Sequence, residues 1–450
     1  MPDNEKKSHL VAMVGAGPAG IYATRKLAEA GHTVVLLNRD IKPGGMAEYG
    51  IYLTKYKMKE GLRKQFRKIF SNPRVNYFGH VTVGDGKDIT LKALKGIGIS
   101  TIVISAGAQG TKKLGIPGED CTGVYHAKDV VYHFNNLPPF SERSFEIGRR
   151  VAIVGMGNVM VDIANWLIHF KKAEEVLIVA RRGPVEKAYD EKEFDEIRPY
   201  LDVEDLRREV AGLKSRLEAV GQNAEEALAA FGEQKTPPTG QRFRFRFFCS
   251  PRRVIPNAQG GVGALEVEEN ELVLKDGRTV AQGLGRTRQL EVDSMIYAIG
   301  DQVDPAIGIP FSRGLFVCNP GTLPGNPNPA QYQAYDPGSQ KVLEGIFLVG
   351  WSRKASVGIV GISKQDAERG MKVVNAYLDS REGLSSEEID RGLKTLKDNL
   401  RERGASFVTK EEVGLIEAAE EEEASKRNLK EYKFASDREM LDLLQASGKT

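Results

Sequence analysis

LVAMVGAGPAG, at residues 10–20, is the stretch that decides the fold of this 450-residue chain. Its first five residues are apolar and predict a buried strand, and the residues from 18 to 30 have the periodicity of a helix. Between strand and helix, Gly15, Gly17 and Gly20 are spaced as GxGxxG. A second strand is predicted at residues 33–37, which completes a βαβ unit.

The three glycines each meet a steric need of a dinucleotide site. Gly15 permits a tight turn, Gly17 lets a pyrophosphate approach the backbone, and Gly20 lets the helix pack closely on the strand. The phosphates would lie at the positive end of the helix, where Pro18 and Ala19 stand. A glycine turn with a purely structural role is the alternative. Strand, helix and spacing together favour dinucleotide binding.

A second unit of the same kind is predicted from a strand at 150–154, a helix at 159–170 and a strand at 175–180. Gly155 and Gly157 repeat the turn and close-approach positions, while Met160 replaces the third glycine.

The residues after the last of these strands predict the coenzyme. Arg181 and Arg182 stand where an NAD-binding unit places an acid. Arginine donates paired hydrogen bonds to phosphate oxygens, so the two side chains suit the 2′-phosphate of NADP(H). The sequence therefore predicts NADPH rather than NADH, with a solvated pair of surface arginines as the alternative.

Two such units predict an α/β protein with two Rossmann-like dinucleotide-binding domains, the NADP domain inserted into the other. Strand-like runs at 101–105 and 295–299 end in small residues, Ala106-Gly107 and Gly300, as expected where a strand closes near a ligand. The predicted domain ranges are 1–110 and 318–450 for the two parts of the outer domain, and 111–317 for the inserted domain.

Three further segments carry structural predictions only. Residues 203–232 are predicted to be helical, and residues 319–338, rich in Pro, Gly and Asn, to cross the surface without regular structure. The C-terminal tail from residue 385 is predicted to be helical, and its charges, including Glu420 to Glu423, are interpreted as a solvated face.

Composition excludes several classes of function. The net charge of +3 argues against nucleic acid as a partner, and no apolar run approaches the ~20 residues that a membrane helix needs. Cys121, Cys249 and Cys318 are too scattered for a CxxC redox pair or an iron–sulfur cluster, so electrons must pass through an organic cofactor, and no metal is predicted. Residues 1–9 lack an apolar targeting core, which predicts a cytoplasmic location.

A set of motifs extends along nearly the whole chain. They are VGAGPAG at 14–20, KQF at 64–66, YFGHVTVG at 77–84, SAGAQ and IPGED within 105–120, GNV at 157–159 with Asp162, ARRGP at 180–184, FRFFCSP at 245–251, FLVGW at 347–351 with the GW pair Gly350-Trp351, VGIVGISKQDA at 357–367, and the end at 407–444. These motifs are similar to those of the adrenodoxin reductase type of ferredoxin–NADP reductase, in the superfamily that includes the small subunit of glutamate synthase. The GW pair is the most specific, because related disulfide reductases usually place an acid after that glycine.

This resemblance implies an FAD domain made from both ends of the chain, with an NADPH domain between them. It places Gly45 and Met46 beside the flavin, Val81 at the adenine, and Trp351 with residues 358–360 around the isoalloxazine. A helix start at Gly358 could stabilise negative charge on reduced flavin. The predicted cofactor-binding residues are Gly15, Gly17, Pro18, Ala19, Gly20, Asn38, Arg39, Gly45, Met46, Val81, Ala106, Gly107, Gly155, Gly157, Asn158, Val159, Arg181, Arg182, Glu193, Gly350, Trp351, Gly358, Ile359 and Val360. Among them, Asn158 and Val159 are implied at the NADP pyrophosphate and Glu193 near its adenosine ribose.

Two departures from the family pattern stand out. Asn38, followed by Arg39, occupies the position of the ribose-binding acid. An amide oxygen accepts a ribose hydroxyl more weakly than a carboxylate does, so Asn38→Glu is predicted to tighten FAD. A histidine-containing loop of the family is replaced by IYLTKYKMK at 51–59, which is closer to the glutamate synthase small subunits; their cysteine-rich domain has no counterpart here.

The predicted reaction is hydride transfer from NADPH to FAD, followed by single-electron transfer to a ferredoxin-like iron–sulfur protein. It depends on the orientation of the two cofactors, so no catalytic acid or base is predicted. The first alternative is an FAD and NADPH electron-transfer subunit of a larger complex, of the glutamate synthase or 2-oxoacid oxidoreductase type. The second is an NADP-sensing protein that has lost its flavin.

Two basic segments are candidates for binding an acidic ferredoxin. Residues 55–68 contain seven lysines and arginines and one acid, Glu60. In RFRFRFF, strand periodicity places Arg242, Arg244 and Arg246 on one face, and Arg246 aligns with the partner-binding strand of the family. Solvated faces are the alternative for both segments.

Overall fold

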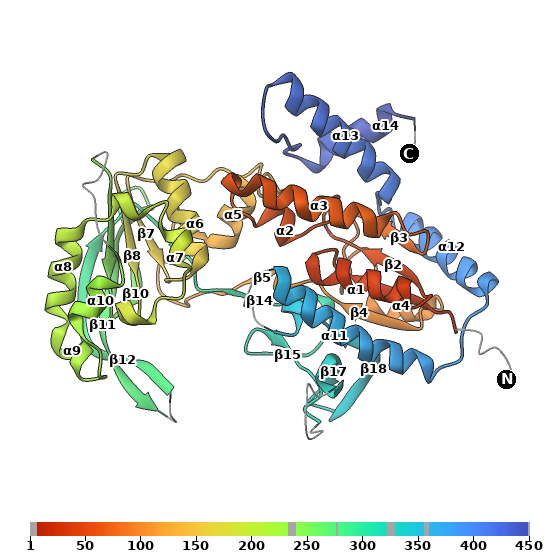
Figure 1. Cartoon of the computed structure of the whole chain (residues 1–450), viewed down its shortest axis with the longest axis horizontal. Coiled ribbons are helices and arrows are strands. Elements are labelled where there is room, and N and C mark those ends of the chain that lie inside the picture. The colour runs from red at the N-terminus through yellow and green to blue at the C-terminus, as the bar shows by residue number, and fades with distance from the viewer. Residues whose placement is uncertain (1–6, 233–239, 276–277, 322–328, 355–359, 449–450) are drawn as a thin grey trace. The chain divides into compact units, whose positions relative to one another are not determined.

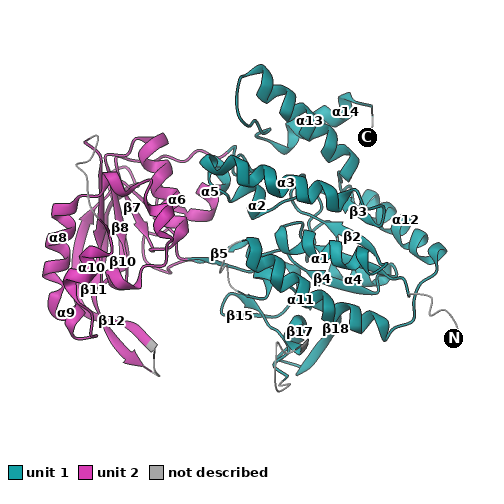
Figure 2. Cartoon of the chain, in the orientation of Figure 1, with its two compact units in different colours: residues 1–112, 132–142, 300–450 teal, residues 113–131, 143–299 magenta. Residues whose placement is uncertain are grey.

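The computed structural model describes residues 7–232, 240–275, 278–321, 329–354 and 360–448 (Figure 1). It consists of two compact units (Figure 2). Unit 1 comprises residues 1–112, 132–142 and 300–450, and unit 2 comprises residues 113–131 and 143–299. Unit 2 is therefore an insertion in unit 1.

Unit 1 is built on a six-stranded sheet of order β17-β18-β4-β1-β2-β3. All neighbouring strands are parallel except β17 and β18. The strands are β1 (Leu10–Val14), β2 (Thr33–Leu37), β3 (Val75–Phe78), β4 (Thr101–Ile104), β17 (Gln333–Asp336) and β18 (Lys341–Leu348). Because the strands run in parallel, their carboxyl ends lie at one edge of the sheet, where the first glycine loop also lies.

Helices cover both faces of this sheet. Val11 and Met13 of β1 face the layer of α1 (Pro18–Glu29), α3 (Tyr56–Phe70), α11 (Val360–Asp379), α13 (Lys410–Lys426) and α14 (Asp437–Ala446). Leu10, Ala12 and Val14 face the other layer, which contains α4 (Leu91–Gly96) and α12 (Ser386–Glu402). This alternation follows from the two-residue period of a strand. The short helix α2 (Met46–Tyr49) precedes α3.

Unit 2 has a five-stranded parallel sheet of order β6-β13-β7-β8-β9 and a three-stranded antiparallel sheet β10-β11-β12. The strands are β6 (Val124–His126), β7 (Arg150–Val154), β8 (Glu175–Val179), β9 (Arg242–Arg246), β10 (Cys249–Pro256), β11 (Val262–Lys275), β12 (Arg278–Glu291) and β13 (Ser294–Tyr297). The helices include α5 (Ala127–Phe134), which ends in unit 1, α6 (Asn158–Trp166), α7 (Glu191–Phe194), α8 (Val203–Gly212), α9 (Lys214–Glu218) and α10 (Ala224–Ala229).

The predicted helical structure at 203–232 is confirmed, and it is divided into three short helices, since turns interrupt it at Leu213 and at Gly221 and Asn223 caps α10. Another structural prediction needs correction. Within 319–338, predicted to be irregular, residues 333–336 form β17, an edge strand paired with β18. Backbone pairing with β18, the next strand in the chain, decides this structure against the local composition.

Within the described ranges, no helix is both long and apolar enough to cross a membrane. The cytoplasmic location stays a prediction.

Candidate functional site

The first glycine loop of unit 1 has no room for side chains at two of its glycines. Gly15 has φ of +102°, and a Cβ there would lie 2.7 Å from the carbonyl oxygen of Ser105. A Cβ on Gly20 would lie 2.0 Å from the carbonyl oxygen of Gly15. The Ser105 hydroxyl completes the packing by donating to that same oxygen over 2.7 Å. These contacts fix the loop between β1 and α1.

Gly17 differs from its neighbours because the space in front of it is open. A Cβ built on Gly17 meets no described atom within 4 Å. Gly17 is the N-cap of α1, no side chain caps this helix, and Pro18 occupies its first turn. The first backbone N–H groups of α1 are thus open to an anion at the positive helix end.

Three other predicted segments surround this open position. A Cβ on Gly45 would lie 3.0 Å from the Cα of Gly17, which places Gly45 and Met46 beside the loop. Gly350 has φ of +64°, and its Cβ would lie 2.6 Å from the Cβ of Ala19. Ala106 and Gly107 form the third of these segments. A Cβ on Gly15 would lie 2.7 Å from the Cα of Ala106, and the N–H of Gly107 donates to the Ser352 hydroxyl over 3.0 Å.

The turn that contains Trp351 is held by a buried acid, Asp366 of α11. Its carboxylate accepts the N–H of Gly350 over 2.7 Å and forms an ion pair with Arg353. The buried Nε1–H of Trp351 has no hydrogen-bond partner among the described residues. A buried N–H without a partner is costly, so this donor fits a ligand acceptor such as a flavin.

Asn38 binds protein groups on all sides. Its Oδ1 accepts the N–H of Ala16 over 3.0 Å. Its Nδ2 donates to the carbonyl oxygens of Asp40 and Lys42 and to the Tyr77 hydroxyl, over 2.8, 3.1 and 3.1 Å. The side chain is buried, and its hydrogen bond to Ala16 stabilises the glycine loop. The carbonyl oxygen of Asn38 accepts the N–H of the buried Val81 over 2.8 Å.

Arg39, next in the chain, is partly exposed and is engaged on both sides. Its guanidinium pairs with Asp40 over 2.8 Å, and Nη1 donates to Gln109 over 3.2 Å. Because Gln109 follows Ala106 and Gly107, Arg39 ties the end of β2 to the segment after β4.

The second glycine loop, in unit 2, repeats this arrangement. Gly155 has φ of +122°, and a Cβ there would lie 2.3 Å from the carbonyl oxygen of Ala298. Gly157 is the N-cap of α6 and has no side-chain cap, and its Cβ would meet nothing nearer than the Ala188 carbonyl oxygen at 4.0 Å. Met160, in place of the third glycine, is fully buried.

The predicted NADP-selecting residues lie at the carboxyl end of β8. The side chains of Arg181 and Arg182 are exposed, and neither forms an ion pair within the described part of the chain. Their backbone is fixed, since the carbonyl oxygen of Arg181 accepts from Asn270 and that of Arg182 accepts from Phe248. The two guanidiniums are therefore available to a phosphate.

The remaining residues predicted to bind NADP are Asn158, Val159 and Glu193. Asn158 and Val159 are exposed on the first turn of α6, and the Oδ1 of Asn158 accepts the N–H of Asp190 over 2.7 Å. Asp190 is the N-cap of α7, which contains Glu193. This hydrogen bond links the start of α6 to the helix of Glu193.

Two predicted flavin residues, Gly358 and Ile359, lie outside the described residues, and Val360 is the first residue of α11. Sequence reasoning assigned no role to Ser105, Ser352 or Asp366. Asp366 lies within the motif VGIVGISKQDA. Its position among the core-facing residues of this helix was the sequence signal that could have identified it as a buried acid. No group of three or more potential metal ligands occurs in the parts of the chain that the structure covers.

The basic strand β9 is largely neutralised within unit 2. Phe243, Phe245 and Phe247 are buried on one face, so the predicted alternation is confirmed. On the other face, Arg244 and Arg246 both pair with Asp205 of α8. Burial would raise the pKa of Asp205, but the two arginines lower it to about 2.

Comparisons with known proteins agree with this geometry. Residues 9–206 match the family described as pyridine nucleotide-disulphide oxidoreductase. The chain is 29% identical over 394 residues to the NADPH-ferredoxin reductase FprA of Mycobacterium leprae, which covers 80% of this chain and 82% of that protein. It is 24% identical over 469 residues to the mitochondrial NADPH:adrenodoxin oxidoreductase of Arabidopsis thaliana, over 96% and 94% of the two chains. The solved structure of Mycobacterium tuberculosis FprA in complex with NADPH matches with a TM-score of 0.78 and 25% identity, over 98% of this chain and 99% of that chain.

Two units, each with a parallel sheet and a glycine loop, define a two-domain dinucleotide-binding oxidoreductase fold, and the predicted α/β class is confirmed. Along most of its length the chain is similar to NADPH reductases of the adrenodoxin reductase type.

Proposed function

We propose that the chain is an NADPH-dependent flavoprotein reductase that passes single electrons to a ferredoxin-like iron–sulfur protein. In this proposal unit 1 is the FAD domain and unit 2 is the NADP domain. The observation that carries the proposal is the pair of open glycine loops, at Gly17 and at Gly157, each at the start of an uncapped helix. The names of the relatives, which are NADPH reductases of ferredoxin or adrenodoxin, point to the same reaction.

The residues of unit 1 fit FAD. The open backbone at Gly17 and the N–H groups of α1 would hold the pyrophosphate, and the free Nε1–H of Trp351 would face the flavin. When bound, the flavin accepts two electrons as hydride and releases them one at a time. The protein contributes binding and orientation, since Gly45, Met46, Ala106 and Gly350 are fixed around the loop.

The NADPH assignment is tested by the coenzyme preference of flavin reduction. Anaerobic mixing with NADPH should bleach the flavin absorbance much faster than mixing with NADH. In an Arg181→Ala, Arg182→Ala double variant this preference should fall by roughly 100-fold, because each charge-assisted hydrogen bond to phosphate contributes about 1.5–3 kcal/mol. The matched control is Arg207→Ala, Arg208→Ala, an exposed pair on α8 of the same unit. Full preference in the first variant would disprove the assignment.

The surface of α3 separates the basic run into two groups. Lys59, Arg63 and Arg67 pair with acids of the C-terminal part of the chain. Lys57, Lys64 and Lys68 are exposed, and among the described residues none of the three forms an ion pair. Exposed lysines attract an acidic partner by long-range electrostatics.

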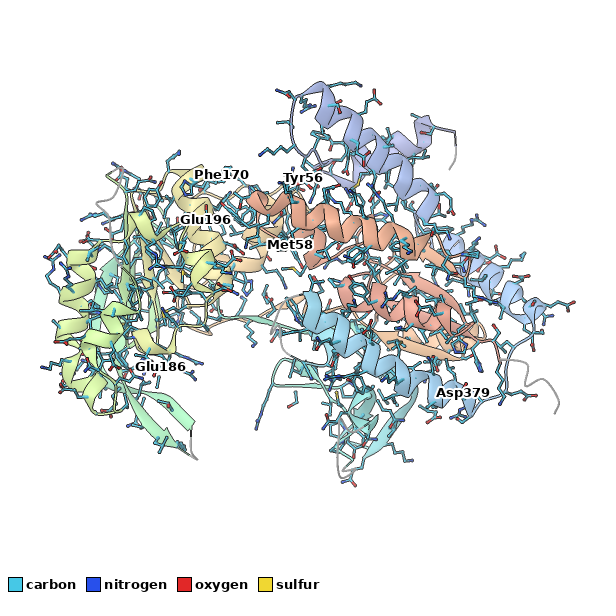
Figure 3. The ribbon with its side chains drawn as sticks, in the orientation of Figure 1. Tyr56, Met58, Phe170, Glu186, Glu196 and Asp379 are labelled. Atoms are coloured by element: carbon cyan, nitrogen blue, oxygen red, sulfur yellow. The ribbon has the colours of Figure 1, made fainter. Side chains whose placement is uncertain are left out.

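An exposed apolar residue of α3 lies next to this basic face. Met58, labelled on α3 in Figure 3, is 57% exposed. An acidic iron–sulfur carrier would therefore meet both charge and apolar surface. Six residues, 50–55, separate α3 from α2, which begins at the proposed flavin residue Met46. We place the carrier on this face.

This placement is tested by reversing two of the charges. Lys64→Glu, Lys68→Glu should slow electron transfer to adrenodoxin about 10-fold at low ionic strength, with little effect in high salt, since salt screens steering. The reduction of flavin by NADPH should stay unchanged. The matched control is Arg391→Glu, Lys394→Glu, exposed on α12 at the other face of the sheet. Equal rates for the two variants would exclude this face. Isolation as a stable complex with an iron–sulfur subunit would favour the alternative of a complex-bound electron-transfer subunit.

A further inference from the structure

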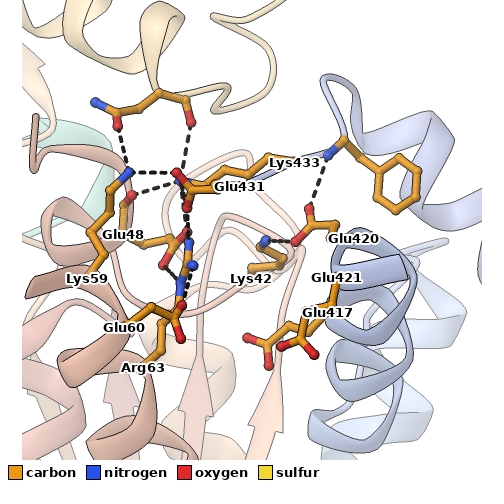
Figure 4. Close-up of polar contacts among 12 residues, drawn as sticks. Lys42, Glu48, Lys59, Glu60, Arg63, Glu417, Glu420, Glu421, Glu431 and Lys433 are labelled. Atoms are coloured by element: carbon orange, nitrogen blue, oxygen red, sulfur yellow. Dashed lines mark hydrogen bonds and ion pairs between the residues drawn. The ribbon is translucent and has the colours of Figure 1, made fainter. Parts of the chain in front are cut away.

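A cluster of buried charges joins the C-terminal segment to α2 and α3 (Figure 4). Lys433 donates to the Glu48 carboxylate over 2.8 Å and to the Glu48 carbonyl oxygen over 2.9 Å. Glu431 pairs with Lys59 over 3.0 Å and also with Arg63. The members of this buried charge cluster are Lys42, Glu48, Lys59, Glu60, Arg63, Glu420, Glu431 and Lys433.

The cluster corrects the interpretation of the tail as a solvated face at Glu420, whereas Glu421 and Glu422 are exposed as predicted. Glu420 is 6% exposed and pairs with Lys42, which is 4% exposed. Lys59 is 0% exposed and Lys433 is 5% exposed, and the four cations of the cluster face four anions. Charges buried to this degree are retained only when they are paired, so each member depends on its partner.

The pKa shifts of Glu48 and Lys433 follow from burial and from these partners. Burial alone would raise the pKa of Glu48, but Lys433, Arg63 and Lys42 hold it well below its usual range. Burial lowers the pKa of Lys433 to about 8, against the attraction of Glu48 and Glu431. Lys433 also lies over the ring of Tyr49 at 4.6 Å and donates to the carbonyl oxygen of Asn135 over 3.4 Å.

The cluster reaches the flavin side of unit 1 through α2. This helix has only four residues, so it cannot be stable by itself and its position is set by its contacts. At its start, Gly45 packs against Gly17 of the first glycine loop. At its end, the Glu48 carbonyl oxygen and carboxylate are held by Lys433, a cation placed at the negative end of the helix.

Apolar packing between the tail and α3 is incomplete beside the cluster. A cavity of about 530 Å³ lies between α3 and α13, lined by Phe66, Phe70 and Val413 among others. A cavity removes contacts that would otherwise fix the two helices against each other. The ion pairs therefore add contacts between the tail and α3 where the apolar packing is interrupted.

We propose that Lys433 and Glu431 are positioning residues of the FAD site: they hold α2 from the C-terminal side and so keep Gly45 and Met46 against the first glycine loop. This inference rests on the proposed function, because FAD is the ligand that α2 would contact.

The test compares Lys433→Met with Lys426→Met, an exposed lysine of α13 that pairs with Glu422. The dissociation constant of FAD is measured by flavin fluorescence, and melting temperatures are measured with and without saturating FAD. Lys433→Met should weaken FAD binding at least about 10-fold and reduce the rise in melting temperature that FAD causes, since that rise depends on the affinity. Binding of NADPH to unit 2 should not change.

A purely structural role gives a different result. It would lower the melting temperature equally with and without FAD and leave the dissociation constant as in Lys426→Met, which overturns the proposal. Should Lys433→Met fail to fold, Glu431→Gln decides by the same measurements, with about 3-fold weaker FAD expected. Lys433→Arg, which keeps the charge, should restore most of the affinity. A wild-type protein that binds no FAD would refute the proposed function as well, whereas wild-type binding with an unaffected variant refutes only this inference.

Discussion

Gly17 and Gly20 lie three residues apart in one motif, yet the structure predicts opposite effects for alanine at the two positions. A Cβ on Gly17 meets nothing within 4 Å, and φ of −77° suits alanine. Alanine is a poorer N-cap than glycine by up to about 1 kcal/mol, and the loss of a flexible glycine from the unfolded chain restores about 0.4–1 kcal/mol. The melting temperature of FAD-free Gly17→Ala should therefore stay within about 2 °C of wild type.

The same methyl group would occupy the space that a pyrophosphate needs. Gly17→Ala should weaken FAD binding at least about 100-fold, or about 2.7 kcal/mol. In Gly20→Ala the added Cβ would lie 2.0 Å from the Gly15 carbonyl oxygen and 2.5 Å from the Ser105 hydroxyl. That overlap with backbone should destabilise the fold by about 3 kcal/mol or more, with or without ligand. Circular dichroism melts and an FAD fluorescence titration measure both effects. Wild-type FAD affinity in Gly17→Ala would refute the assignment of this loop to the pyrophosphate.

Three further predictions follow from buried groups. Asp366→Asn should lower the free energy of unfolding by about 3 kcal/mol, because the buried Arg353 loses the carboxylate with which it pairs. The control is Asp379→Asn, at the exposed end of the same helix (Figure 3). Equal melting temperatures of the two variants would contradict the prediction. Asn38→Glu should destabilise the protein by about 1–3 kcal/mol, because a carboxylate cannot donate to the three groups that accept from Nδ2 of Asn38. The same variant should not bind FAD more tightly. A lower dissociation constant of FAD in a titration would instead support the expectation drawn from the sequence. The pKa of Lys433 is lowered from 10.5 to about 8 in the folded protein. Between these pH values the unfolded chain therefore holds a proton that the folded chain has released. The free energy of unfolding should consequently rise with pH across this range, by up to about 3 kcal/mol from this lysine. Denaturant titrations across that range should show the rise in wild type and not in Lys433→Met.

Much of the fold and many of the candidate site residues could be predicted from local sequence. The strands at 10–14, 33–37 and 150–154 have the predicted bounds, because a buried parallel strand is a short apolar run that glycine or a turn ends. The steric demands at Gly15 and Gly20 were predictable for the same reason, since they arise from a loop of a few residues. The irregular structure expected within 319–338 was wrong at β17, where pairing with β18 outweighs local composition.

The role of Asn38 shows where local reasoning ends. Its position at the end of β2 was predictable, but its side chain binds Ala16, Lys42 and Tyr77, which reach it from three parts of unit 1. The expected contact with a ribose hydroxyl assumed that the Asn38 amide had no partner within the protein. In the tertiary structure both its oxygen and its nitrogen form hydrogen bonds with protein groups.

The sequence by itself determined the two glycine loops, the arginine pair at 181–182 and the α/β class, because each depends on neighbours within about thirty residues. Only the tertiary structure decided which charges are free and which are buried. Lys59 and Glu431 are 372 residues apart, and Lys433 and Glu48 are 385 apart, so no local pattern relates them. The acidic tail and the basic helix each resemble a solvated surface when taken alone. Part of each becomes a buried cluster because folding removes Lys59, Glu420 and Lys433 from water together with their partners, and opposite charges make this burial possible.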